Sequence, residues 1–123
     1  MIVAGVGFSS GAAAAEIVAL VRRAESLAGH AAEILAAPDF KEDAACLREA
    51  VQTLGLPLRL VDRAALAAAQ ENCPTQSEVA AQVVGLGSVA EACALAGAGE
   101  KSHLLVARLT QGNVTCALAG DLP

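Results

Sequence analysis

Aromatic and basic side chains are scarce in this sequence. Phe8 and Phe40 are the only aromatic residues, and 8 Lys and Arg stand against 13 Asp and Glu, for a net charge of −5. Proteins that bind single-stranded nucleic acid stack its bases on aromatic side chains. Nucleic-acid sites in general also cluster Lys and Arg. Both shortages argue against nucleic acid as a partner.

Long uncharged apolar runs are also missing, although hydrophobic residues make up 55% of the 123-residue chain. No such run reaches the roughly 18 residues that a membrane-spanning helix needs. No basic residue precedes Arg22, so neither a secretory signal nor an arginine-rich transit peptide fits the N-terminus. We therefore predict one domain over residues 1–123, in the cytoplasm and without a membrane partner.

The four cysteines lack the spacing of a metal site. No Cys-x-x-Cys pair occurs, and no nearby His completes a zinc site around Cys46, Cys73, Cys93 or Cys116. Cysteines in a cytoplasmic chain are usually reduced, and reduced cysteines often serve as small core residues. We predict four reduced cysteines, no metal and no cofactor.

Strand-like and helix-like segments alternate along most of the chain. Strands are predicted at residues 2–7, 33–37, 57–61, 104–109 and 114–119, and helices at residues 12–27, 44–54, 62–70, from 75 and 88–98. The last two strands flank a turn at residues 110–113 that is rich in hairpin residues. The predicted fold class is α/β: a three-layer α/β/α sandwich with a mainly parallel sheet and a C-terminal antiparallel hairpin.

The stretch GVGFSSGAAAAEI, residues 5–17, resembles a nucleotide-binding turn but departs from its spacing. The dinucleotide fingerprint needs Gly where Ser10 stands, and the next glycine is Gly11. The acid that should contact the ribose about 20 residues further on comes too late, at Asp39. No Gly-Lys-Ser/Thr triplet of a P-loop occurs. These departures count against a nucleotide-binding domain.

Two segments still carry groups that could bind an anion. A glycine turn that leads into a helix can offer backbone N–H groups to a carboxylate, and Ser9 and Ser10 can add hydroxyl donors; a plain helix cap is the alternative reading. Asp39 and Lys41 follow the second predicted strand, at the sheet edge where α/β proteins bind ligands. An exposed turn is the alternative there.

Four blocks of sequence together resemble one protein family. They are GVGFSSGAAAAEI, ILAAPDFKED, LGLPLRLVD, and VVGLGSVAEACAL with the closing pair LLVARLTQGNVTCALA. In this order, and over nearly the whole chain, they resemble CobE and the C-terminal domain of CbiG, proteins of cobalamin (corrin ring) biosynthesis. The Gly-Ser-Val-Ala-Glu-Ala stretch is the most specific of them.

The resemblance implies three ligand-binding loops. Carried over position by position, it assigns Gly5, Gly7 and Gly11 to the first, Asp39 and Lys41 to the second, and Gly87, Ser88, Val89, Ala90 and Glu91 to the third. If these loops share one sheet edge, they line a cleft for a ligand with many carboxylates. A precorrin or corrin intermediate is such a ligand.

The sequence also departs from the relatives. Phe8-Ser9 stands where relatives often carry a basic pair, and Arg108 stands near a position where fused relatives carry lysine. Fused relatives, which are associated with opening a ring lactone, also carry further N-terminal sequence. The expectation is therefore a chain most like a stand-alone CobE, to which lactone hydrolysis is not transferred.

Two functions fit these residues. In the first, the chain binds a precorrin or corrin intermediate and assists its processing by hydrolytic chemistry: Lys41 holds a carboxylate or oxyanion, and Asp39 or Glu91 orients water. Glu91 has an alternative reading as half of a capping box with Ser88. In the second function, the chain is a non-catalytic corrinoid carrier or a partner of another pathway enzyme.

Overall fold

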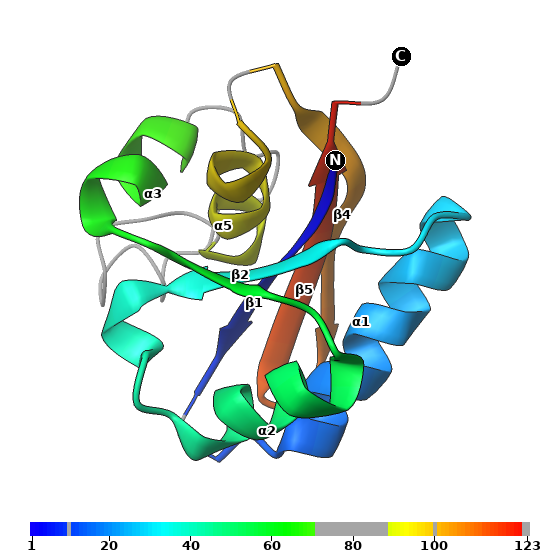
Figure 1. The fold of residues 1–123 in the computed structure, drawn as a ribbon, viewed down its shortest axis with the longest axis vertical. Coiled ribbons are helices and arrows are strands. Elements are labelled where there is room, and N and C mark those ends of the chain that lie inside the picture. The colour runs from blue at the N-terminus through cyan, green and yellow to red at the C-terminus, as the bar shows by residue number, and fades with distance from the viewer. Residues whose placement is uncertain (10, 71–88, 100, 122–123) are drawn as a thin grey trace.

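The computed structural model describes residues 1–9, 11–70, 89–99 and 101–121 (Figure 1). Its strands are β1 (Ile2–Phe8), β2 (Ile34–Pro38), β3 (Leu58–Val61), β4 (His103–Gln111) and β5 (Val114–Gly120). Its helices are α1 (Ala14–Ala28), the 3-10 turn η1 (Asp39–Lys41), α2 (Ala45–Leu54), α3 (Arg63–Gln70) and α5 (Val89–Ala98). These elements confirm the predicted order, whereas the helix expected from residue 75 lies outside the described residues.

The five strands form one sheet in the order β3-β2-β1-β5-β4. The pairs β2·β3 and β1·β2 are parallel, with Ala36 opposite Arg59 and Gly5 opposite Ala36. The pairs β1·β5 and β4·β5 are antiparallel, with Gly5 opposite Ala117. The α/β class and the antiparallel hairpin are confirmed; in detail the sheet is mixed, because the C-terminal hairpin pairs with the central strand β1.

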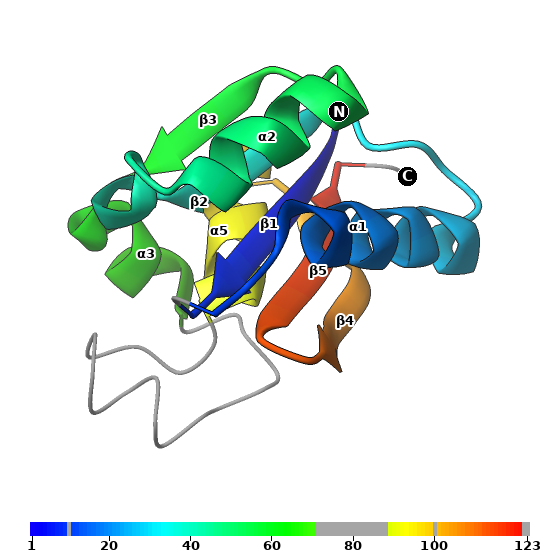
Figure 2. The ribbon, with the colours of Figure 1, turned by 90° about the horizontal axis from the view of Figure 1, so that it is seen from below.

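Helices cover both faces of this sheet (Figure 2). Side chains alternate along β1, so that Ala4 and Val6 pack in the cluster of α1 and α2, while Val3 packs in the cluster of α3 and α5. Each cluster buries aliphatic side chains almost completely. The predicted three-layer sandwich is therefore confirmed.

Left-handed glycines end the two helices on the first face. Gly29 follows α1 with φ 73° and Gly55 follows α2 with φ 69°, and their N–H groups donate to Glu25 O and Val51 O at 2.9 Å. Glycine adopts this conformation without the steric cost that a Cβ brings. The sequence predicts the Gly55 cap, and the structure confirms it.

Helix α5 packs directly on β1 because Gly5 has no side chain. A Cβ at Gly5 would lie 2.2 Å from Ala90 O and 2.4 Å from Ala94 N, too close for any other residue. At the other end of the helix, a Cβ at Gly97 would lie 2.9 Å from the Val3 side chain. This close approach buries α5 on nearly all sides and brings its first residue, Val89, to the end of β1.

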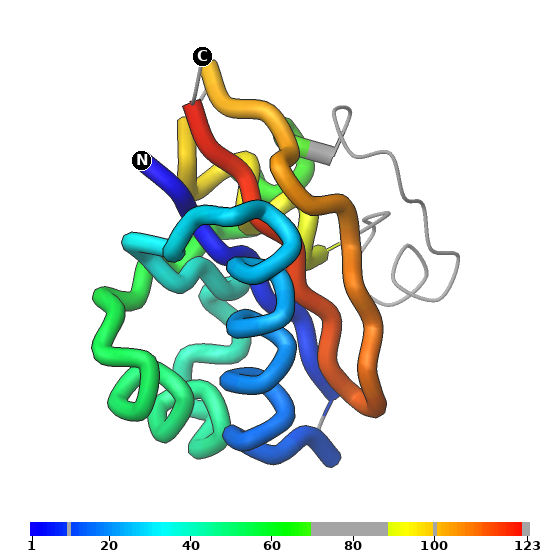
Figure 3. The backbone as a smooth tube through the Cα atoms, turned by 90° about the vertical axis from the view of Figure 1, so that its right-hand side faces the viewer, coloured from blue at the N-terminus to red at the C-terminus, as the bar shows by residue number. Residues whose placement is uncertain are grey.

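The C-terminal hairpin runs alongside β1 (Figure 3). Strand β4 continues to Gln111, which pairs with Val114, so the turn is shorter than predicted and consists of Gly112 and Asn113. Gly112 has φ 59°, which suits a tight hairpin turn. The pairing of β4 with β5 shifts twice, between Leu104 and Val106 and between Val106 and Leu109.

The described part of the chain gives further information on the membrane and cysteine predictions. None of its helices combines the length and the apolar character needed to cross a bilayer. Cys93 and Cys116 are buried in the clusters on opposite faces of the sheet, and Cys46 is half-buried. Cys73 lies outside the described residues.

Candidate functional site

The carboxyl end of β1 brings together several segments that are distant in sequence. Strands β1, β2 and β3 run parallel, so their last residues, Phe8, Pro38 and Val61, lie at one edge of the sheet. Val114 pairs with Phe8, which places the β4–β5 turn at this edge as well. Val89 also starts α5 there, next to Gly7. In open α/β sheets this is the edge where ligands bind.

The glycines of the first block lie in different places. Gly5 and Gly7 are inside β1 rather than in the loop that follows it, and both face α5. A Cβ at Gly7 would lie 2.8 Å from the hydroxyl of Thr115, which donates to Gly7 O at 3.3 Å. Only Gly11 lies in the loop, exposed beside the Asn113 amide. Ligand contacts of these glycines remain a prediction.

The loop after β1 is tied to the hairpin turn. The Ser9 N–H donates to Asn113 O at 3.1 Å, and the Ala12 N–H donates to Ser9 O at 3.0 Å. Ser9 itself is exposed, so its hydroxyl is accessible from solvent. Ser10, the second predicted hydroxyl donor, lies outside the described residues.

The N-terminus of α1 already holds a carboxylate of the chain. Glu16 Oε1 accepts the N–H of Ala13, the N-cap residue, at 2.9 Å. Ala13 has no side-chain acceptor, so this is only the glutamate half of a capping box. One of the N–H groups that the sequence offers to a ligand carboxylate is therefore occupied by Glu16.

The second predicted loop contacts the end of β1 through a cation–aromatic contact. Asp39 and Lys41 form the two ends of η1, directly after β2, and the Lys41 ammonium lies 5.2 Å from the centroid of the Phe8 ring. Cations within about 6 Å of an aromatic centroid are attracted by the ring face. In the same turn Phe40 carries the Arg63 guanidinium over its ring at 5.4 Å. Two cations therefore stand on ring faces at this edge.

Glu91 of the third predicted loop is inside the protein. Its side chain is 0% exposed, and its Oε2 accepts the backbone N–H of Arg108 at 3.0 Å. Arg108 lies where the β4–β5 pairing shifts, which leaves its N–H available to α5 rather than to β5. Glu91 thus links α5 to the edge strand. Gly87 and Ser88, including the capping box expected at Ser88, lie outside the described residues.

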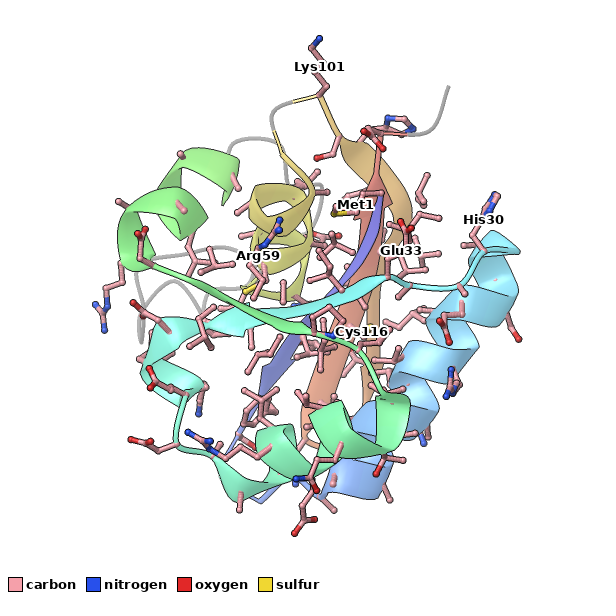
Figure 4. The ribbon with its side chains drawn as sticks, viewed as in Figure 1. Met1, His30, Glu33, Arg59, Lys101 and Cys116 are labelled. Carbon is pink, nitrogen blue, oxygen red and sulfur yellow. The ribbon has the colours of Figure 1, made fainter. Side chains whose placement is uncertain are left out.

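A guanidinium fixes the other end of α5. Arg59 Nη1 donates to Gly97 O, close to the C-terminus of the helix, where a cation also complements the helix dipole (Figure 4). Arg59 lies on β3, the outermost strand on one side of the sheet, so this hydrogen bond connects β3 to α5. Arg59 and Glu91 together hold α5 at both ends.

A shallow hollow lies at the opposite end of the sheet. It is lined by residues at and after the end of α1: Arg22, Glu25, Ser26, Gly29, His30 and Ala31. Glu25 is already engaged, because its Oε1 accepts from Arg22 at 3.1 Å and its Oε2 accepts the Ala32 N–H at 2.7 Å. None of the predicted site residues that the structure describes lines this hollow.

Sequence reasoning missed three residues at the carboxyl edge. Phe40, Arg63 and Asn113 lie beside the predicted loops. Arg63 directly follows the residue after β3, so the rule that selected Asp39 and Lys41 after β2 could have found it. The roles of Phe40 and Asn113 depend on contacts between strands that sequence spacing does not reveal.

Residues 2–119 match the protein family described as Cobalamin synthesis G C-terminus. Protein CobE of Sinorhizobium sp is 32% identical over 122 residues, which cover 97% of this chain and 79% of that protein.

Two crystal structures have the same fold. CobE, a protein from the cobalamin (vitamin B12) biosynthetic pathway, superposes with a TM-score of 0.89 at 32% identity, over 97% of this chain and 89% of the other. The cobalamin biosynthesis protein ChiG from Agrobacterium tumefaciens str. C58 superposes with a TM-score of 0.79 at 38% identity, over 100% of both chains. The chain therefore belongs to the cobalamin synthesis G C-terminal family, a family of cobalamin biosynthesis proteins.

Proposed function

We propose that this protein binds a precorrin or corrin intermediate at the carboxyl edge of β1, β2 and β3 and assists its processing. The observation that carries the proposal is the position of Lys41. Its ammonium lies on the Phe8 ring at 5.2 Å, and within the described ranges no carboxylate pairs with it. A ring face holds a cation in place and leaves its N–H donors to a ligand.

Two of the few cations of the chain lie at this edge, together with the acids Asp39 and Asp62. With a net charge of −5, cations are the minority, yet Lys41 and Arg63 both stand at neighbouring strand ends. A corrin precursor is an apolar ring bordered by carboxylates, so it presents both chemical features that this edge offers. Cations on ring faces meet its carboxylates, and the partly exposed Phe40 meets apolar surface.

The residues suit hydrolytic assistance in the following way. The Lys41 ammonium holds a carboxylate of the ligand or stabilises a developing oxyanion, and Asp39, exposed in the same turn, orients a water molecule. Glu91 acts differently, because its buried carboxylate accepts from Arg108 and so positions α5. It is therefore a positioning residue in this proposal.

A carrier or a partner of another pathway enzyme is the alternative function. It is favoured by one observation: among the described residues no hydrogen bond or ion pair joins Asp39 to Lys41, whereas an acid–base pair in an enzyme is usually held in mutual contact. A carrier keeps its pigment unchanged, and an enzyme changes it with turnover.

One experiment tests both functions. The purified protein is incubated with a panel of precorrin and corrin intermediates and re-isolated by gel filtration, and the retained pigment is identified by absorbance and mass. Retention of an unchanged pigment supports the carrier, and a changed mass or spectrum supports assistance in processing. If no member of the panel is retained or converted, the proposal is wrong.

A further inference from the structure

We infer that Arg63 is a second carboxylate-binding cation of the proposed site, and that Phe40 holds its guanidinium toward the ligand. The inference rests on the proposed function and extends it to a residue outside the three predicted loops. Arg63 is the first residue of α3, and its guanidinium carbon lies 5.4 Å from the centroid of the Phe40 ring.

The two cation–aromatic contacts connect three neighbouring strand ends. Phe8 ends β1 and carries Lys41, while Phe40, directly before Lys41 in η1, carries Arg63 from the start of α3 after β3. The chain has no other aromatic residue. Both of its aromatic rings are therefore used to hold a cation at this edge.

Within the described residues, three of the five other arginines are occupied by acceptors of the protein. An oxygen of the chain accepts from each of Arg22, Arg48 and Arg59. Arg63 contacts a ring instead, and the neighbouring acid is engaged elsewhere, because Asp62 Oδ1 caps α3 by accepting the Ala65 N–H at 2.8 Å. A ring accepts no hydrogen bond in the way a carboxylate does, so the planar N–H donors of the guanidinium stay available to a carboxylate of the ligand.

Two cations at one edge favour a ligand with carboxylates at separate positions of one ring. Once Lys41 binds one carboxylate, Arg63 meets the next at a high effective concentration, so both contacts together bind more tightly than either alone. The guanidinium also matches carboxylate geometry in a bidentate way, which an ammonium does not. The structure thus points to a macrocyclic polycarboxylate rather than a small monocarboxylate.

Uroporphyrin is a suitable probe, because it is a stable, water-soluble tetrapyrrole rich in carboxylates. Its affinity is measured by absorbance titration at neutral pH for the wild type, Arg63→Gln, Arg63→Lys and the control Arg23→Gln. Arg23 is an exposed residue of α1, so its replacement removes the same charge from another surface. Far-UV circular dichroism verifies that each variant is folded.

We expect Arg63→Gln to weaken uroporphyrin binding about two- to fivefold, the effect of losing one exposed ion pair, and Arg23→Gln to leave it nearly unchanged. Arg63→Lys should lie between Arg63→Gln and the wild type, because it keeps the charge and loses the planar donors. If the wild type binds but Arg63→Gln and Arg23→Gln lose affinity equally, the inference is wrong and the proposed function stands. If the wild type does not bind uroporphyrin, the inference is wrong, and the proposed function is decided by the panel of precorrin and corrin intermediates.

Discussion

The ammonium of Lys41 lies 5.2 Å from the centroid of the Phe8 ring. Phe8 is the last residue of β1, and Lys41 ends the turn directly after β2, so the contact joins two neighbouring strand ends. The end of β1 contributes the ring, and the second predicted loop contributes the cation.

Gly5 is the residue whose replacement should disturb the packing most. In Gly5→Ala the new Cβ would lie 2.2 Å from Ala90 O, and backbone atoms cannot rotate away as a side chain can. We expect a loss of about 3 kcal/mol in the free energy of unfolding, at the upper end of overpacking effects. The measurement is urea unfolding followed by circular dichroism, since the chain has no Trp or Tyr for fluorescence.

Gly11→Ala is the matched control for this prediction. Gly11 belongs to the same glycine block but is exposed, and the nearest atom to its Cβ would be the Asn113 amide nitrogen at 3.0 Å, the end of a flexible side chain. A change within about 0.5 kcal/mol is expected. Equal unfolding midpoints for Gly5→Ala and the wild type would show that α5 does not pack on β1 as described.

Removing the Glu91 carboxylate should loosen α5 from β4. In Glu91→Ala the partly buried N–H of Arg108 loses the Oε2 acceptor that lies 3.0 Å away, and the buried Glu91 side chain leaves a cavity. We expect a loss of roughly 1–3 kcal/mol in the free energy of unfolding. Glu91→Gln keeps an acceptor of the same shape and should lose less. If both variants have the same free energy of unfolding as the wild type, Glu91 does not hold α5.

The Cys116 thiol should be inert in the folded protein. Burial, with a smaller contribution from the negative charge of Glu25, raises its pKa from 9.0 to about 12. The reactive species is the thiolate, which is therefore almost absent at neutral pH. Alkylation by iodoacetamide, mapped by mass spectrometry, should spare Cys116 and label half-buried Cys46 faster. Equal labelling of the two in the folded state would contradict this prediction.

The same pKa shift has a consequence for stability. Between about pH 9 and about pH 12 the folded state keeps the Cys116 proton while the unfolded state loses it, so the stabilising contribution is complete below pH 9 and decreases as the pH rises. Wild type and Cys116→Ala are compared by urea unfolding at about pH 8 and about pH 10. The wild type should lose more stability over this interval. Parallel losses would argue against the raised pKa.

Local pattern was enough to predict the elements of the fold. Alternating strands and helices, and a glycine directly after α2, depend on neighbours in sequence, and the structure confirms them. The order of the strands depends on pairing between segments that are distant in sequence. The hairpin was therefore predicted correctly, but its antiparallel pairing with the central strand β1 was not.

The candidate site likewise has residues that local sequence predicts and contacts that depend on segments distant in sequence. Asp39 and Lys41 are found at the expected sheet edge, because both follow a strand. The family resemblance assigns Gly5 to a ligand-binding loop, whereas its small size serves the contact with the backbone of α5. The contact between Lys41 and Phe8 requires β1 and β2 to be neighbours, which spacing in the sequence does not state.

The central claim is that a corrin intermediate binds at the edge that carries Lys41. The most direct test is gel filtration of the wild type, Lys41→Ala and Lys101→Ala after incubation with the panel of intermediates, with the retained pigment measured by absorbance. Lys101 is an exposed lysine of the segment between α5 and β4, away from this edge (Figure 4). We predict retention by the wild type and Lys101→Ala and a clear loss from Lys41→Ala. Equal retention by all three proteins, or none by the wild type, would contradict the claim.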